Sequence, residues 1–151
     1  GLPLAQVDAV IHRQSIIHSP VEYRDGAMIA QLGTPDMKLP IRYALTYPYR
    51  AATSDKPLDL LSCGPLTFSA PDEEAFPCLR IAKDCAAAGG TACAIMNGAN
   101  EVAVAQFLRG EIGFNDIARR VERALSRVAV KYQPSLGDIL EADRLGREAA
   151  R

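Results

Sequence analysis

The chain has 151 residues, of which 48% are hydrophobic and 23% charged, and its 17 basic and 18 acidic residues leave a formal net charge of −1. This length suffices to bury a hydrophobic core, whereas the balanced charge argues against a nucleic-acid partner, which needs a concentrated basic surface. No apolar run approaches the ~20 residues that cross a bilayer, so we expect a cytoplasmic protein with no membrane partner.

A β-hairpin is predicted around Asp25-Gly26, which lies between two β-rich runs. An Asp-Gly pair supplies the positive φ angles of a two-residue type I′ turn. Pairing outward from such a turn sets Val21 opposite Ala30 and gives one largely apolar face. The other, largely polar face then includes His18.

The segment after the hairpin is predicted to contain one short helix. Pro40 is compatible with the first turn of a helix that runs through Thr46, and Pro48 ends it, because proline is tolerated at a helix start but not inside. Residues 51–56 are polar and are expected to form a loop. Residues 65–71, PLTFSAP, are typical of a strand.

Residues 76–150 show the pattern of helices separated by turns. One helix is expected between Pro77 and Gly89-Gly90, and a second over residues 91–109, with apolar side chains at spacings of three and four. Asn115 is predicted to cap a third helix, and a fourth begins near Ser135. Short connections among amphipathic helices favour a bundle.

These elements predict an α+β fold in which a partial mixed sheet with a β-hairpin precedes an α-helical bundle. The expected domains are residues 1–70, the sheet portion, and residues 71–151, the bundle.

The sequence offers no recognisable metal or dinucleotide site. The four cysteines, Cys63, Cys78, Cys85 and Cys93, lack zinc or redox spacing, and we expect buried free thiols. Consecutive carboxylates at residues 72–74 would fan out around a helix and cannot easily converge on one cation. No G-x-G-x-x-G turn follows a strand.

The two histidines and Ser15 are the candidates for local chemistry in this part of the chain. His12 is expected to have a hydrogen-bonded structural role, because a metal pair with His18 would lack a third ligand. Ser15 has no base partner arranged for nucleophilic catalysis, so a hydrolase is disfavoured. The structural interpretation of Ser15 is that its hydroxyl satisfies a backbone group at a strand end.

Five separated blocks, IHRQSIIHS, VEYRDG, AQLGTPDM, NGANEVAVAQFL and IGFNDI, resemble the later part of the 1-deoxy-D-xylulose-5-phosphate reductoisomerase family. The blocks occur in the family's order and spacing, and the resemblance runs from about Val7 to the C-terminus. Arg13 and Pro20 depart from it, since the family pattern has proline and methionine there.

The resemblance implies an enzyme that uses NADPH and Mg²⁺ or Mn²⁺ to convert 1-deoxy-D-xylulose 5-phosphate to 2-C-methyl-D-erythritol 4-phosphate, as a homodimer. It places Ser15 beside substrate and nicotinamide as a hydrogen-bond donor, and His18 at the edge of the active site. Pro35 and Met37 match an apolar wall of that site. It assigns this chain no catalytic residue and no metal ligand.

The family's nucleotide-binding domain and acidic metal-binding motif would lie before Gly1, so we expect the chain alone to be inactive and to bind no cofactor tightly. The competing hypothesis is a stand-alone, non-catalytic dimerisation or binding module derived from the same fold.

Overall fold

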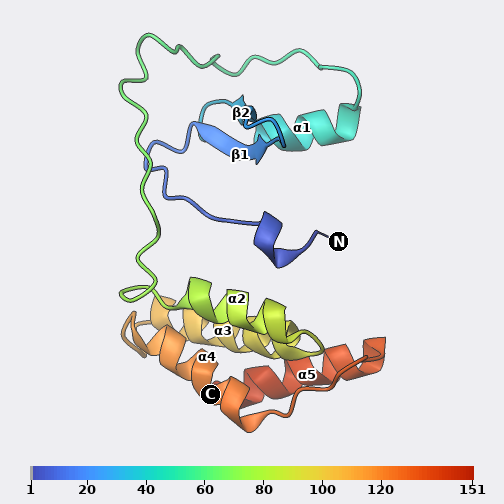
Figure 1. The fold of residues 1–151 in the computed structure, drawn as a ribbon. Helices are drawn as coiled ribbons and strands as arrows, with labels where there is room; N and C mark the ends of the chain where they lie inside the picture. The colour runs from blue at the N-terminus through green and yellow to red at the C-terminus, as the bar shows by residue number, and fades with distance from the viewer. Residues whose placement is uncertain (1) are drawn as a thin grey trace. The chain divides into compact units, whose positions relative to one another are not determined.

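The computed structural model describes residues 2–151, which form two compact units (Figure 1). One unit is Ala9–Ala70; the other combines Pro71–Arg151 with the residues up to Asp8. The α+β class and the order of hairpin and helical bundle are confirmed. The residues before Ala9 were expected in the sheet portion but cluster with the helices, where Lys83 Nζ lies 3.7 Å from a carboxylate oxygen of Asp8.

The hairpin of the Ala9–Ala70 unit pairs β1 (Ile17–Glu22) with β2 (Met28–Leu32) in antiparallel orientation. Among the described residues the sheet has these two strands and is therefore not mixed. The Tyr23 N–H donates to the Ala27 carbonyl at 2.8 Å, and Gly26 has a φ of +83°. This is the three-residue loop in which a turn is followed by a left-handed glycine.

The predicted hairpin register is wrong by one residue. Val21 pairs with Ile29 rather than Ala30, because the loop holds three residues rather than two. A β-bulge then lies between His18 and Val21, where Ser19 has a φ of +47°. The bulge inserts one extra residue into β1, so the predicted apolar and polar faces do not continue along the strand.

Helix α1 (Lys38–Thr46) follows β2 and ends where the sequence predicts. It begins two residues before Pro40, which lies in its first turn. Residues 51–56 are irregular, as predicted. The expected strand over residues 65–71 is reduced to a single bridge, in which Ile11 and Ser69 exchange backbone hydrogen bonds of 2.9 and 3.0 Å.

The helical unit contains the predicted four helices and a short 3-10 helix. Their bounds are η1 (Leu4–Gln6), α2 (Cys78–Ala88), α3 (Ala92–Leu108), α4 (Asp116–Arg127) and α5 (Leu136–Ala149). Helix α3 packs against α2, α4 and α5 (Figure 1). Its Ile95, Ala99 and Ala103 are fully buried, and Val121 of α4 is only 1% exposed. None of the helices within residues 2–151 is long and apolar enough to span a membrane.

Two helix starts differ in how they are capped. The Ser135 hydroxyl accepts from the Asp138 N–H at 3.2 Å, and Asp138 accepts from the Ser135 N–H at 3.0 Å, which completes a capping box for α5. Asn115 precedes α4 as predicted, but its side chain caps nothing. Asp116 instead accepts from the Gly113 N–H at 3.0 Å.

The cysteines are free, but the expectation that they are buried holds only in part. Cys85 is buried in the helical core, Cys63 is half-buried, and Cys78 and Cys93 are exposed. Cys85 lies one turn after the buried Ile81 on the core face of α2. Burial raises the pKa of the Cys85 thiol, so it behaves as a small apolar side chain.

Glycines allow α3 and α5 to approach closely. A Cβ at Gly146 would lie 2.5 Å from the Ile95 carbonyl oxygen, and a Cβ at Gly98 would lie 2.6 Å from that of Asp143. Gly137, at the start of α5, has only an ordinary contact at 3.7 Å.

We predict that Gly146→Ala lowers the free energy of unfolding by about 1–3 kcal/mol, because the methyl group forces the two helices apart. Gly137→Ala is the matched control and should raise the free energy of unfolding by about 0.5 kcal/mol, because alanine has a higher helix propensity than glycine. Urea unfolding followed by circular dichroism measures both. Equal effects of the two variants would contradict the close contact between α3 and α5.

Candidate functional site

A cavity of about 900 Å³ lies within the Ala9–Ala70 unit, between the hairpin and α1. Its volume falls within the range of small-molecule sites. All four residues that the sequence analysis singled out, Ser15, His18, Pro35 and Met37, line it. The lining also includes residues that the sequence analysis did not identify: Ser19, Gln31, Asp36, Leu39, Pro40, Tyr43, Ala44, Tyr47 and Arg50.

Ser15 reaches the cavity from a turn that precedes β1. Its N–H donates to the His12 carbonyl at 3.1 Å, and its φ of +51° is uncommon for a residue other than glycine. In the part of the chain that the structure describes, neither the Ser15 hydroxyl nor the His18 ring makes a hydrogen bond. Both side chains are therefore available to a ligand.

His12 anchors this turn to the segment that ends the unit. Its Nδ1 lies 2.9 Å from the Thr67 carbonyl oxygen, and its ring stacks on Phe68 with centroids 4.7 Å apart. His12 thus has the hydrogen-bonded structural role expected from the sequence. Its Nε2 is buried and has no partner among residues 2–151.

Gln14 completes the attachment of the turn. Its amide group donates to the Thr67 hydroxyl at 2.9 Å and accepts from the Thr67 N–H at 3.2 Å. We call the contacts of His12 and Gln14 with Thr67 and Phe68 the 12–68 clamp. Because the clamp joins segments more than 50 residues apart, it fixes the turn that carries Ser15 independently of the hairpin.

The apolar wall of the cavity follows β2. Asp36 accepts from the Lys38 N–H at 2.9 Å, and this hydrogen bond holds the turn between Pro35 and α1. The same hydrogen bond lowers the pKa of the Asp36 carboxyl. Pro35 and Met37 flank this residue, and Met37 is 67% exposed, so the wall offers apolar surface to a ligand.

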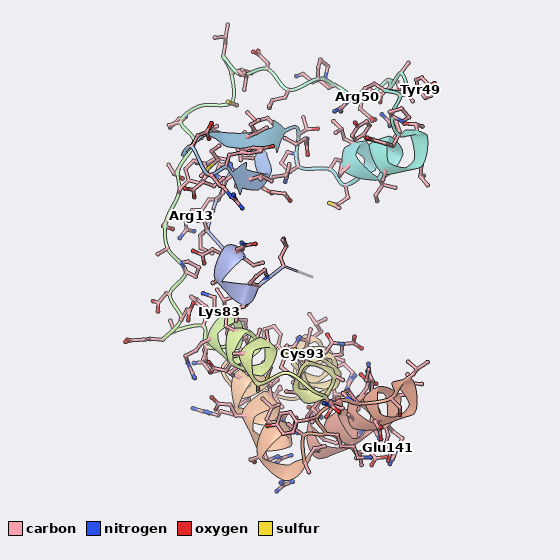
Figure 2. All side chains as sticks on the ribbon, turned by 45° about the vertical axis from the view of Figure 1, so that its right-hand side comes forward. Arg13, Tyr49, Arg50, Lys83, Cys93 and Glu141 are labelled. Atoms are coloured by element: carbon pink, nitrogen blue, oxygen red, sulfur yellow. The ribbon has the colours of Figure 1, made fainter. Side chains whose placement is uncertain are left out.

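Helix α1 contributes an aromatic face to the same cavity. Tyr43 and Tyr47 lie one turn apart with ring centroids at 5.7 Å in an edge-to-face arrangement. The Arg50 guanidinium carbon lies 3.9 Å from the Tyr43 ring centroid. Figure 2 shows Tyr49 and Arg50 just past the end of α1.

The described side chains of the cavity offer hydrogen-bonding and apolar groups but no cluster of metal ligands. Within residues 2–151, no group of three or more His, Cys, Asp or Glu side chains could hold a metal ion. Asp36 is the one carboxylate of the lining, and a hard divalent cation needs several oxygen ligands. Hydrogen bonding, shape and exclusion of water are what these side chains supply.

Residues 32–149 match the family model of the DXP reductoisomerase C-terminal domain. The chain belongs to this family. A 1-deoxy-D-xylulose 5-phosphate reductoisomerase of Symbiobacterium thermophilum is 51% identical over 151 residues, which are all of this chain and 39% of that relative. The Pseudomonas aeruginosa PAO1 relative is 52% identical over 97% of this chain and 37% of its own length.

Solved structures of the family share this fold. The enzyme of Zymomonas mobilis in complex with NADPH has a TM-score of 0.90 and 43% identity, over 99% of this chain and 39% of that one. A DOX-P reductoisomerase in complex with NADPH, fosmidomycin and magnesium has a TM-score of 0.85 and 43% identity, over 93% of this chain and 37% of that one. The chain thus spans about two fifths of the length of its relatives.

We predict that Gln14→Ala lowers the free energy of unfolding of the Ala9–Ala70 unit by about 1 kcal/mol, because it removes the hydrogen bonds between Gln14 and Thr67 and leaves only the His12 contacts of the 12–68 clamp. The amide NMR signals of Ser15 and His18 should shift with it. Gln6→Ala, at an exposed position in η1, is the control. Unchanged Ser15 and His18 signals would show that the clamp does not position the site.

Proposed function

We propose that this chain forms the substrate- and nicotinamide-facing wall of a 1-deoxy-D-xylulose 5-phosphate reductoisomerase. The reaction is the NADPH-dependent conversion of that substrate to 2-C-methyl-D-erythritol 4-phosphate, in non-mevalonate isoprenoid biosynthesis. The observation that carries the proposal is the lining of one cavity by Ser15, His18, Pro35 and Met37 in a chain of this family.

The cavity suits the nicotinamide end of the cofactor, because one side is apolar and the other carries hydrogen-bonding groups. NADPH, when bound, supplies the hydride for the reduction. Pro35 and Met37 exclude water from the ring, which protects the hydride from side reactions. The Ser15 hydroxyl donates a hydrogen bond to the bound ligand, and His18 orients polar groups at the edge of the pocket.

The divalent metal of the reaction is not assigned to this chain, because the described side chains do not fit one. We propose that the ligands of a Mg²⁺ or Mn²⁺ ion and the nucleotide-binding turn belong to other parts of the full-length enzyme. We also propose a cytoplasmic homodimer. Its support is the exposed apolar surface of the hairpin, where Val21 and Ile29 are 54% and 62% exposed.

The test is a chimera in which this chain replaces the matching segment of the Symbiobacterium thermophilum relative. We expect the chimera to oxidise NADPH when 1-deoxy-D-xylulose 5-phosphate is added, and the isolated chain to be inactive. A folded chimera without turnover would contradict the proposal and favour a non-catalytic binding module.

Within the active chimera, Ser15→Ala should lower kcat/KM by about tenfold, the effect of one lost hydrogen bond to the ligand. Ser62→Ala is the control, since this exposed residue does not line the cavity. Steady-state kinetics measure both. If the two variants behave alike, Ser15 does not face the ligand.

A further inference from the structure

Two consecutive residues of β1, His18 and Ser19, both line the cavity between the hairpin and α1. In a regular strand successive side chains point to opposite faces of the sheet, so a regular β1 would present only one of them to the cavity. The bulge between His18 and Val21 interrupts this alternation, and Ser19 has a φ of +47° there. The bulge therefore brings the Ser19 hydroxyl to the cavity together with the His18 ring.

The backbone at Ser19 is strained for a residue other than glycine, because a Cβ disfavours the left-handed region. Such strain persists where the surrounding structure imposes it, and it is concentrated at functional sites. Pro20 follows and has no N–H to withdraw from the ladder, so the bulge sacrifices no hydrogen bond of that residue. Gln133 of the helical unit has a comparable φ of +55° but does not line the cavity.

Gln31 of β2 lies opposite His18. The two residues pair across the hairpin, and both line the cavity. Gly33 leaves room for the Gln31 side chain, because a Cβ at Gly33 would lie 2.9 Å from the Gln31 side-chain nitrogen. The Gly33 N–H donates to the Ile16 carbonyl at 3.0 Å, which fixes the chain just after β2. We call Ser19, His18 and Gln31 the polar face of the cavity.

The side chains of the polar face are available to a ligand. In the part of the chain that the structure describes, no hydrogen bond involves the Ser19 hydroxyl, the His18 ring or the Gln31 amide. A hydroxyl and an amide each donate and accept hydrogen bonds without carrying a charge, and an imidazole can also do both. This combination matches neutral polar groups of a ligand, namely hydroxyl, carbonyl and carboxamide groups.

We propose that Ser19 and Gln31 are further ligand-contacting residues, which hydrogen-bond a neutral polar group of the ligand beside His18. The assignment rests on the proposed function, in which the ligands are NADPH and 1-deoxy-D-xylulose 5-phosphate. The polar group is either the carboxamide of the nicotinamide or a hydroxyl or carbonyl of the sugar chain. Gly33 acts through Gln31, because it leaves space for the amide.

The experiment uses the chimera and measures two quantities: the dissociation constant of NADPH by isothermal titration calorimetry, and kcat/KM for 1-deoxy-D-xylulose 5-phosphate at saturating NADPH. Ser19→Ala and Ser19→Gly should each weaken one of the two by about 3- to 10-fold, the worth of one neutral hydrogen bond. Gln31→Met keeps the length of the side chain but lacks the amide, and it should affect the same quantity. Weaker NADPH binding assigns the carboxamide, and a lower kcat/KM at unchanged NADPH affinity assigns the sugar chain.

The two serine variants separate the hydroxyl from the backbone. Glycine relieves the strain at a positive φ and alanine does not, so Ser19→Gly should unfold at a higher temperature than Ser19→Ala, although both lose the same affinity. Gln133 supplies matched controls outside the cavity, because Gln133→Gly relieves the same kind of strain and Gln133→Met removes an amide. Both controls should leave NADPH binding and kcat/KM unchanged.

If the Ser19 and Gln31 variants behave like the Gln133 controls, the assignment is overturned, while turnover by the unsubstituted chimera would still uphold the proposed function. A loss in only one of the two serine variants would trace the effect to the backbone and would also overturn the assignment. If the unsubstituted chimera neither binds NADPH nor turns over, both proposals fail.

Discussion

The site depends on the 12–68 clamp, which ties the turn before β1 to the segment that ends the same unit. His12 and Gln14 reach Thr67 across more than 50 residues of sequence, and the bridge between Ile11 and Ser69 lies beside them. A two-stranded hairpin alone is marginally stable in water. The clamp supplies the long-range contacts that hold Ser15 in a left-handed conformation at one side of the cavity.

The helix ends could be predicted from the sequence because contacts between nearby residues determine them. The strand register could not, because it depends on pairing between separate segments. The capping box at Ser135 and the glycines after α2 set helix ends through contacts a few residues apart, so their sequence signals were sufficient. The prediction of the hairpin register was wrong because an Asp-Gly pair also suits a three-residue loop. The bulge at Ser19 adjoins Pro20, a residue that strands tolerate at edges and bulges, but its position is set by the strand pairing.

The cavity combines residues that resemblance could identify with residues that it could not. Ser15, His18, Pro35 and Met37 lie in recognisable sequence blocks, and the structure places them around one cavity. Tyr43 and Tyr47 are four residues apart in a predicted helix, a spacing that could have indicated a shared face. The contact between Arg50 and Tyr43 required the structure, because the turn after α1 brings the guanidinium onto the ring.

The central claim is that this cavity is where substrate and nicotinamide meet. The most direct test is a crystal structure of the chimera bound to NADPH. The account predicts that the nicotinamide ring packs against Pro35 and Met37 and that the Ser15 hydroxyl lies within hydrogen-bond distance of the ligand. A nicotinamide bound elsewhere, with the cavity holding only solvent, would contradict it.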